Sequence, residues 1–451
     1  MKQLPPIDDR LLDYKFPTVI EDKLKNGLTV LAVEDHRLPK IYFRMGVCFG
    51  EKNDPEQKEG AAQLISQLIR KGTRSRSYRQ IVEEIESAGG SLHTAVSSDF
   101  FYIYGDFLEE HFGTGMELLN EIIRHPTFPP DEFQKERHKL IANLENQKSS
   151  PDYLGHRRMN AALYHPHPYA RTYSQKSIER IRRELLMELH RRYFVPGNAY
   201  LILAGDISRD DGLELARKYL DEWEGQKPAG SGFPLPETPD SRTVQLVNRP
   251  GSAQSNIQLG NLLFPRNHPD YIPLTVMNKI LGGGASGRLF LNLREEKGYT
   301  YGAYSNPSAY REAGGWTAGA EVRTEVTGKA LEAFFDEFEK IRSEKVSDEE
   351  LRNARRYLMG VFPLQNETPA EVAGQILTQK LYQLPPDYWN QYPREVQKVT
   401  AETVLEMARC YILPDQMRIV VVGDAEKIQP ELEQFGPVQM FDLDDNPVGS
   451  L

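Results

Sequence analysis

The sequence predicts an α+β protein made of two homologous tandem halves, each a mainly antiparallel sheet with helices packed on one face. Three observations lead to this fold class: two phrases repeated at a constant offset, a mixture of strand and helix patterns in each half, and a proline-rich segment near the middle of the chain. A chain of 451 residues is also long enough for more than one domain.

The first repeated phrase is a helix, a proline turn, a buried strand and a Gly-Asp turn. It is predicted twice, with helices over 179–192 and 401–410 followed by the prolines Pro196 and Pro414. In both copies the Gly-Asp turn begins nine residues after the proline. The two prolines are 218 residues apart.

A second pair of segments has almost the same offset. Charged helices open near residues 131 and 348, and Asp131 and Ser347 are the predicted helix N-caps. The residues Asp131 and Asp348 are 217 positions apart. Two matches in one register indicate a tandem duplication of a unit of about 220 residues.

Residues 228–242 are rich in proline and glycine and are predicted to be a linker. We therefore expect an N-terminal domain over residues 1–227 and a C-terminal domain over 243–451. In the first half, strands are expected at 28–33, 41–48 and 100–107, and helices at 116–124 and 131–147.

The composition narrows the class of function. The formal net charge of -10 disfavours nucleic-acid binding, which depends on clustered Lys and Arg. No window is apolar enough to predict a membrane span. The two cysteines, Cys48 and Cys410, are too few for a disulfide framework or a thiolate zinc cluster. Two buried free thiols are expected, and a single bridge between them stays an alternative.

The N-terminal segment 1–16 has prolines and charges but no apolar core, so no signal peptide is predicted. The expected compartment is the cytoplasm if Met1 is the true start, and the periplasm if a signal peptide was removed.

One helix of the first half carries a family resemblance. Residues 59–73 read Glu-Gly-Ala-Ala-Gln-Leu-Ile-Ser-Gln-Leu-Ile-Arg-Lys-Gly-Thr. This phrase resembles the zinc helix of M16 (pitrilysin/insulinase-like) peptidases, in which His-x-x-Glu-His precedes an apolar pair and Lys-Gly-Thr. Two imidazoles four residues apart grip one zinc ion, and the glutamate acts as a base. The corresponding positions here are Gln63, Ser66 and Gln67, and none of them can do this chemistry.

The resemblance also implies a third ligand, a glutamate on a later helix. Its register falls at Ala142 and Asn143, which are not acids, although Glu145 is close. The pair His165 and His167 lies in a turn that matches a structural Tyr-x-x-His-Pro phrase of the family, so no metal role is expected there. We therefore expect no metal site in this chain.

The second half keeps more of the family pattern. A glycine-rich run over 282–287 lacks the Gly-Lys-Ser/Thr ending of a phosphate loop. It leads into Arg-Leu-Phe (288–290) and Leu-Arg-Glu (293–295), with Tyr301 seven residues after Arg294. This is similar to the R/Y pair of the family, which faces the zinc across the substrate cavity. The resemblance implies catalytic roles for Arg294 and Tyr301.

The chemistry of this pair is plausible from its residue types. A guanidinium fork can hold a carbonyl or carboxylate, and a phenol can donate to the oxyanion of peptide hydrolysis. The alternative from spacing alone is that Arg294 pairs with a nearby glutamate and Tyr301 packs at an interface. Strand alternation places Tyr299 on the same face as Tyr301, so Tyr299 is a competing candidate.

The resemblance runs from residues 24–30, through 88–95, where the family has an edge strand that pairs with substrate, to the second Gly-Asp turn at 423–424. It implies M16/LuxS-metallohydrolase-like halves. A missing zinc set beside a retained pair is typical of the non-zinc R/Y subunit of a two-chain M16B peptidase. We therefore expect a chain that is inactive alone and forms a heterodimer with a zinc-carrying M16 subunit. Its substrate would be a peptide or an unfolded polypeptide. The alternatives are a catalytically inert scaffold and a peptide-binding homodimer.

Overall fold

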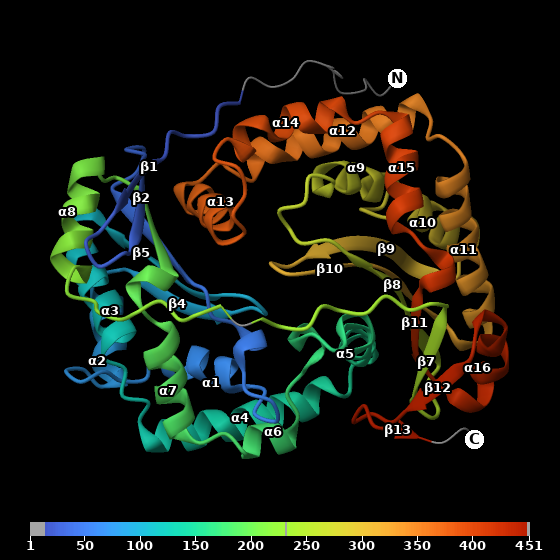
Figure 1. The fold of residues 1–451 in the computed structure, drawn as a ribbon, viewed down its shortest axis with the longest axis horizontal. Helices are drawn as coiled ribbons and strands as arrows, with labels where there is room; N and C mark the ends of the chain where they lie inside the picture. Colours follow the sequence, from blue (N-terminus) through green and yellow to red (C-terminus); the bar gives the residue numbers. More distant parts are fainter. Residues whose placement is uncertain (1–13, 231, 449–451) are drawn as a thin grey trace.

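The computed structural model describes residues 14–230 and 232–448, and these form two sheets, one from each half (Figure 1). Residues 1–13, most of the segment for which no signal peptide is predicted, lie outside the described residues, as does Ser231 of the linker. The first sheet has the strand order β1-β2-β6-β3-β5-β4, and the second β13-β12-β7-β11-β8-β10-β9. The strands of the first sheet are β1 (Ile20–Lys23), β2 (Thr29–Glu34), β3 (Lys40–Val47), β4 (Ser91–Val96), β5 (Phe101–Leu108) and β6 (Ala199–Gly205). Those of the second are β7 (Thr243–Asn248), β8 (Gln254–Leu263), β9 (Thr300–Ala309), β10 (Gly314–Arg323), β11 (Arg418–Gly423), β12 (Val438–Phe441) and β13 (Pro447–Val448).

The two sheets repeat one topology. The order β2-β6-β3-β5-β4 corresponds to β7-β11-β8-β10-β9. In each sheet the first of these neighbours pair in parallel, and the later ones pair antiparallel. The predicted fold class is therefore confirmed: two similar, mainly antiparallel sheets follow each other along the chain.

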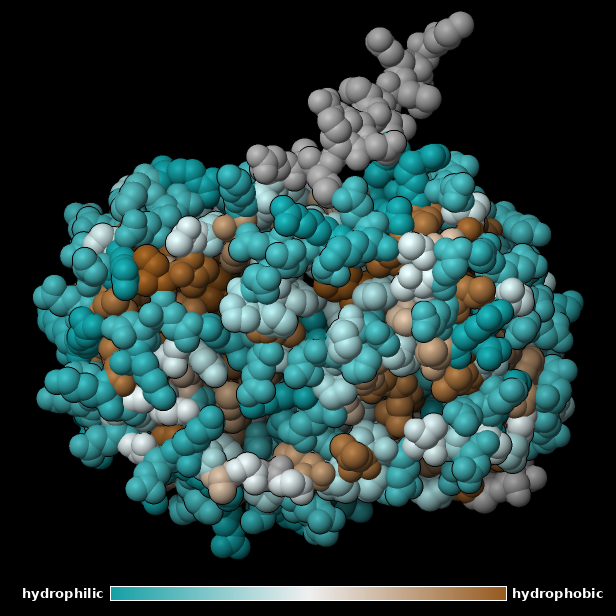
Figure 2. Space-filling model, turned by 45° about the horizontal axis from the view of Figure 1, so that its top comes forward, coloured by the Kyte–Doolittle hydropathy of each residue, from teal (hydrophilic) through white to brown (hydrophobic). Residues whose placement is uncertain are grey.

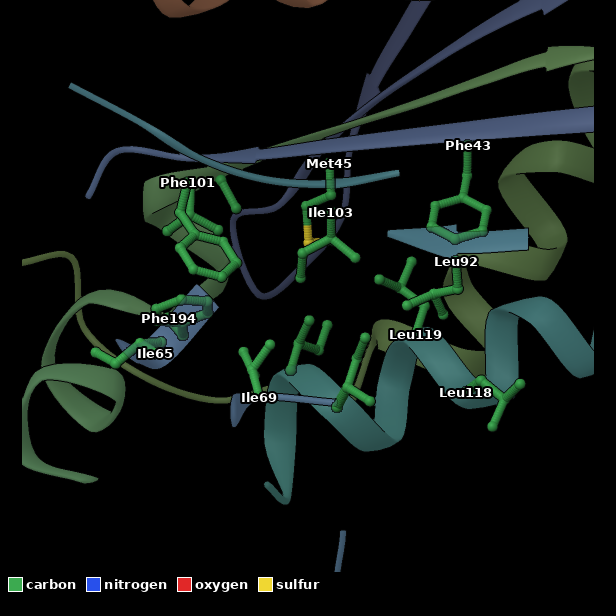
Figure 3. Close-up of a cluster of buried hydrophobic side chains, with 14 of the residues drawn as sticks. Phe43, Met45, Ile65, Ile69, Leu92, Phe101, Ile103, Leu118, Leu119 and Phe194 are labelled. Carbon is green, nitrogen blue, oxygen red and sulfur yellow. The ribbon is translucent and has the colours of Figure 1, made fainter. Parts of the chain in front are cut away.

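Helices of each half cover one face of that half's sheet. In the first half these include α1, α3 and α4, whose apolar side chains pack against the sheet in one core. Figure 3 shows part of this core, with Phe43, Met45 and Ile103 of the sheet and side chains of α1 and α3. Burial of such side chains is the main source of stability for each half. The helices of the first half are α1 (Ala61–Leu68), α2 (Tyr78–Ser87), α3 (Phe112–Arg124), α4 (Pro130–Gln147), α5 (Pro151–Tyr164), α6 (Gln175–Glu179), α7 (Arg183–Tyr193) and α8 (Arg209–Leu220). Those of the second are α9 (Tyr271–Leu281), α10 (Arg288–Phe290), α11 (Thr327–Ser343), α12 (Asp348–Leu364), α13 (Pro369–Leu381), α14 (Tyr388–Lys398), α15 (Ala401–Tyr411) and α16 (Ala425–Leu432).

The other face of each sheet receives a helix from the opposite half. Helix α13 packs on β3 and β6 of the first sheet, and α5 packs on β8 and β11 of the second (Figure 1). Both helices begin with a capping residue and a proline, Ser150-Pro151 and Thr368-Pro369, which are again 218 residues apart. The exchange therefore ties the two halves together and buries both faces of the central strands.

The structure corrects two details of the predicted helices. Ser347 is the N-cap of α12 as expected, and its side chain accepts a hydrogen bond from the Glu350 amide. Asp131 is not a cap, because α4 already begins at Pro130 and Asp131 lies in its first turn. Proline suits the first helical position and an acid suits the first turn. The helix predicted over 179–192 corresponds to α7, which begins four residues later at Arg183, and Glu179 is instead the last residue of α6.

The two cysteines differ in their exposure to solvent. Cys48 and Cys410 are free thiols, but Cys48 is half-buried and Cys410 is exposed, so the expected burial of both was wrong.

The described residues of 228–242 form neither helix nor strand, and we keep 1–227 and 243–451 as proposed domains. Among the described helices, none is long and apolar enough to cross a membrane. On the face seen in Figure 2, hydrophobic residues gather in separate groups among hydrophilic ones.

Candidate functional site

Helix α1 occupies the place of the zinc helix, but it presents amides and a hydroxyl. Its first turn is capped by the buried carboxylate of Asp54, which accepts from the amides of Gly60 and Ala62 at 2.7 and 2.8 Å. Of the three ligand and base positions, Gln63 is half-buried, Ser66 is buried and Gln67 is exposed. The carbonyl of Ser66 accepts a hydrogen bond from Thr94 of β4. The predicted helix is therefore present, but its side chains at the three zinc-site positions are two glutamines and a serine.

The neighbouring helix α4 supplies no replacement ligand. Ala142 and Asn143 are exposed, and the exposed Glu145 pairs with Lys148 of the same segment at 2.7 Å. The buried acid of α4 is Glu136, and it is held by Lys71 at 3.2 Å. Neutral amides and a hydroxyl do not fit zinc, which takes imidazole, thiolate and carboxylate ligands. Within 14–230 and 232–448, no group of three or more His, Cys, Asp or Glu residues is arranged to hold a metal.

The His165-Pro166-His167 turn has a structural role. The His167 ring is buried, with Nε2 3.1 Å from a Glu312 carboxylate oxygen and Nδ1 accepting from the Tyr169 amide at 3.0 Å. Both ring nitrogens are therefore engaged by protein groups. His165 is exposed and takes no part in this contact.

Arg294 and Tyr301 meet at the edge of the second sheet. Arg294 lies in a π-helical turn over Leu291–Glu296, and its guanidinium carbon is 5.2 Å from the centre of the Tyr301 ring. Tyr301 is the second residue of the edge strand β9 and is 84% exposed. Such cation–π contact fixes the mutual position of the two groups while leaving the phenol hydroxyl accessible.

A β-bulge directs Tyr301 away from the core. Thr300 pairs with Val322 and Ala303 with Ala320, so Tyr301 and Gly302 together oppose Glu321 alone. Bulges re-aim side chains in this way and are common beside active sites. The Thr300 hydroxyl stabilises the bulge, because it donates to the Glu321 carbonyl at 2.7 Å and accepts from the Gly302 amide at 3.1 Å.

The prediction that Tyr299 shares the face of Tyr301 was wrong. Tyr299 precedes β9, its amide binds the Leu293 carbonyl at 2.9 Å, and its ring packs against the core of the second half. Strand alternation therefore does not extend back to this residue. Of the two tyrosines, Tyr301 is the one whose ring contacts Arg294.

The glycine-rich run supports the pair instead of binding phosphate. The Gly282 carbonyl accepts from the Ser305 amide of β9 at 2.9 Å, and a Cβ at residue 282 would lie 2.7 Å from that nitrogen. The run therefore closes tightly onto the strand that carries Tyr301. The Lys279 ammonium donates to the Gly283 carbonyl at 2.8 Å, which gives this carbonyl of the loop a hydrogen-bond partner.

Two asparagines that were not singled out from the sequence position this region. The buried Asn278 accepts from the Ser305 hydroxyl and from the Trp316 indole, at 2.7 and 2.8 Å, and so joins α9 to β9 and β10. Asn292 donates to Glu337 of α11 at 2.7 Å and anchors the turn that carries Arg294. An asparagine four residues before a glycine run is only a weak signal, since its partners lie far away along the chain.

A cavity of about 360 Å³ lies next to the pair, on the sheet face that α5 covers. Gly302 and Glu321, the neighbours of Tyr301 at the bulge, line it, as do Tyr304 of β9 and His156 of α5. The pair therefore stands at the border of a hollow at the edge of the second sheet.

Comparisons with known proteins identify the family. Residues 29–176 match the family model described as Insulinase (Peptidase family M16), and residues 180–358 match the one described as Peptidase M16 inactive domain. The chain therefore belongs to the M16 peptidase family, and much of its sequence matches the domain described as inactive.

Curated relatives and solved structures are similar over most of their length. The Bacillus subtilis (strain 168) protein named "Uncharacterized zinc protease YmxG" is 23% identical over 346 residues, 76% of this chain and 83% of the relative. The Helicobacter pylori protein named "Non-peptidase homolog YmxG" is 21% identical over 403 residues, 88% of this chain and 92% of the relative. A crystal structure of a peptidase M16 inactive domain from Pseudomonas fluorescens superposes with a TM-score of 0.84 at 28% identity, over 90% of this chain and 98% of that one. These matches support an inactive-type M16 chain.

Proposed function

We propose that this chain is the non-zinc subunit of a two-chain M16B peptidase and that it supplies Arg294 and Tyr301 to an active site completed by a zinc-carrying M16 partner. One observation carries the proposal. The half-buried Arg294 and the exposed Tyr301 lie in contact at the edge of the second sheet, in a chain whose own α1 has glutamine and serine at the metal positions.

The two side chains have complementary tasks in peptide hydrolysis. The Arg294 fork binds a carbonyl or carboxylate of the substrate. The Tyr301 hydroxyl donates to the oxyanion that forms when water attacks the peptide carbonyl. The substrate is a peptide or an unfolded polypeptide, because an extended chain can reach a site at a strand edge.

Reconstitution with a zinc-carrying M16 chain from the same source tests the proposal. The isolated protein is expected to contain no stoichiometric zinc and to cleave no peptide, whereas the mixture cleaves peptides and loses activity with a chelator. Metal analysis and a fluorogenic peptide assay give the two readouts. One tight zinc ion per isolated chain, or cleavage by the isolated chain, would contradict the proposal.

A second candidate function is a catalytically inert scaffold, and the name of the Helicobacter pylori relative, a non-peptidase homolog, favours it. The double variant Arg294→Ala/Tyr301→Ala separates the two functions in the reconstituted pair. A large loss of kcat with the heterodimer intact supports the active-site role. An unchanged rate supports the scaffold.

A further inference from the structure

A second cavity, of about 560 Å³, lies between the two halves and far across the sheet from β9. Its walls are α5 and the following segment 165–171 from the first half, and the first residues of β7, β11 and β12 from the second. Cavities of this size are typical of small-molecule sites. Its occupant would touch both halves at once.

Three guanidinium groups line this cavity: Arg158 of α5, Arg171 and Arg418 of β11. No Asp or Glu is among the described residues that line it. Arg171 donates to the Lys52 carbonyl at 3.1 Å, and Arg418 donates to the carbonyls of Ala162 at 3.1 Å and Glu237 at 3.5 Å. Backbone carbonyls therefore orient two of the three cations, and the Glu237 carboxylate also acts electrostatically on Arg418.

The third guanidinium, that of Arg158, has an ion-pair partner outside the cavity. Arg158 forms an ion pair with Asp445, which lies outside the cavity lining, at 3.1 Å, and stacks over the Phe441 ring. Burial lowers the pKa of both Arg158 and Arg418, which marks positive charge held partly away from water.

Several polar atoms at this cavity lack a partner. In the part of the chain that the structure describes, Arg158 Nε, Thr243 Oγ1 and Gln245 Oε1 are buried without a hydrogen bond. Buried polar groups are normally paired, so the protein itself does not satisfy all polar atoms of these lining residues. Ala161, Ala162 and Val438 add an apolar wall to the same cavity.

We propose that this cavity binds a small organic anion that carries a phosphate or carboxylate group and is held between α5 and the second sheet by Arg158, Arg171 and Arg418. Guanidinium forks match the geometry of both oxyanions, and the apolar wall accommodates the organic part of the ligand. The site goes beyond the proposed peptidase role and is independent of it. Binding there links the halves and stabilises the folded chain, because the ligand binds only when both are in place.

Isothermal titration of the full-length protein at constant ionic strength tests the proposal, with glucose 6-phosphate, citrate and inorganic phosphate as probes and glucose as the neutral control. We expect saturable binding of an anionic probe, a raised unfolding temperature with it, and no binding of glucose. The comparison of citrate with glucose 6-phosphate distinguishes a carboxylate from a phosphate site. Constant ionic strength removes general screening as a cause. If no anionic probe binds with a Kd below about 1 mM, the proposal is wrong.

Variants assign the binding to this cavity. Arg171→Gln and Arg418→Lys are each expected to weaken the Kd at least about tenfold, since the first removes a charge and the second keeps the charge but loses the fork. Arg79→Gln is the matched control, because Arg79 is exposed on α2 and pairs with Glu83 away from the cavity. Equal affinities in the cavity variants and the control would overturn the proposal, and Arg171→Gln alone decides if Arg418→Lys fails to fold.

Discussion

At the scale of single residues, the hydroxyl of Tyr301 is the group whose contribution can be isolated most cleanly. Tyr301→Phe keeps the ring over Arg294 and removes only a donor on a side chain that is 84% exposed. In the reconstituted peptidase we expect kcat to fall about 100-fold, with little change in KM, because the lost bond is made chiefly in the transition state. Steady-state kinetics on a single peptide measure both constants.

The matched control is Tyr299→Phe, which removes the same atom from a tyrosine packed against the core. It should leave kcat unchanged, and equal losses in the two variants would contradict the role of Tyr301. The Arg294–Tyr301 spacing could be recognised from the sequence because both residues belong to one short phrase. The orientation of Tyr299 could not, because it depends on where β9 begins and on the bulge at Gly302.

At the scale of elements, the close packing of α5 against the second sheet depends on Gly155. A Cβ at this residue would lie 2.5 Å from the side-chain oxygen of Asn256 in β8, which is buried and bound to Gln258. Gly155→Ala is therefore expected to destabilise the protein by about 1–2 kcal/mol, since overpacking outweighs the gain in helix propensity. Urea unfolding followed by circular dichroism measures the change.

Gly360 of α12 provides the control, because it is exposed and a Cβ there meets nothing within 4 Å. Gly360→Ala should stabilise the protein by about 0.5–1 kcal/mol through helix propensity alone. If Gly155→Ala stabilises the protein as much as Gly360→Ala does, the packing argument is wrong.

The exchange of α5 and α13 shows what the sequence could not supply at this scale. The starts of both helices are readable, since each has a capping residue before a proline at one offset of 218 residues. The duplicated strands and α4 were predicted to within a few residues for the same local reasons. Which sheet each helix covers is decided by contacts between the halves, such as Leu377 of α13 against Gly46 of β3, and these have no local pattern.

At the scale of the whole molecule, a buried polar network joins the two halves. Lys52 of the first half is 7% exposed and binds Asp99 at 2.7 Å and Glu312 of the second half at 2.6 Å. His167 approaches the other oxygen of Glu312 at 3.1 Å, and the Tyr169 hydroxyl donates to Asp99. Removal of one carboxylate therefore weakens the contact between the halves without touching either sheet.

The network makes stability depend on pH through Glu312. Burial alone would raise the pKa of Glu312, but hydrogen bonds from His167 and Lys52 and the positive charge of Lys52 lower it to about 2, below its usual 4.5. A lowered folded-state pKa stabilises the protein fully above pH 4.5, and this contribution is lost as the pH falls from there through about 2. We expect Glu312→Gln to cost about 2 kcal/mol at neutral pH, and the difference from the unmodified protein to shrink below pH 4.5. Urea midpoints from about pH 7 down to about pH 3 measure this difference in stability.

The control is Glu395→Gln, which breaks only the exposed pair with Lys398 and should cost less than about 0.5 kcal/mol at every pH. A cost for Glu312→Gln that stays constant over this range would show that Glu312 does not act through its charge.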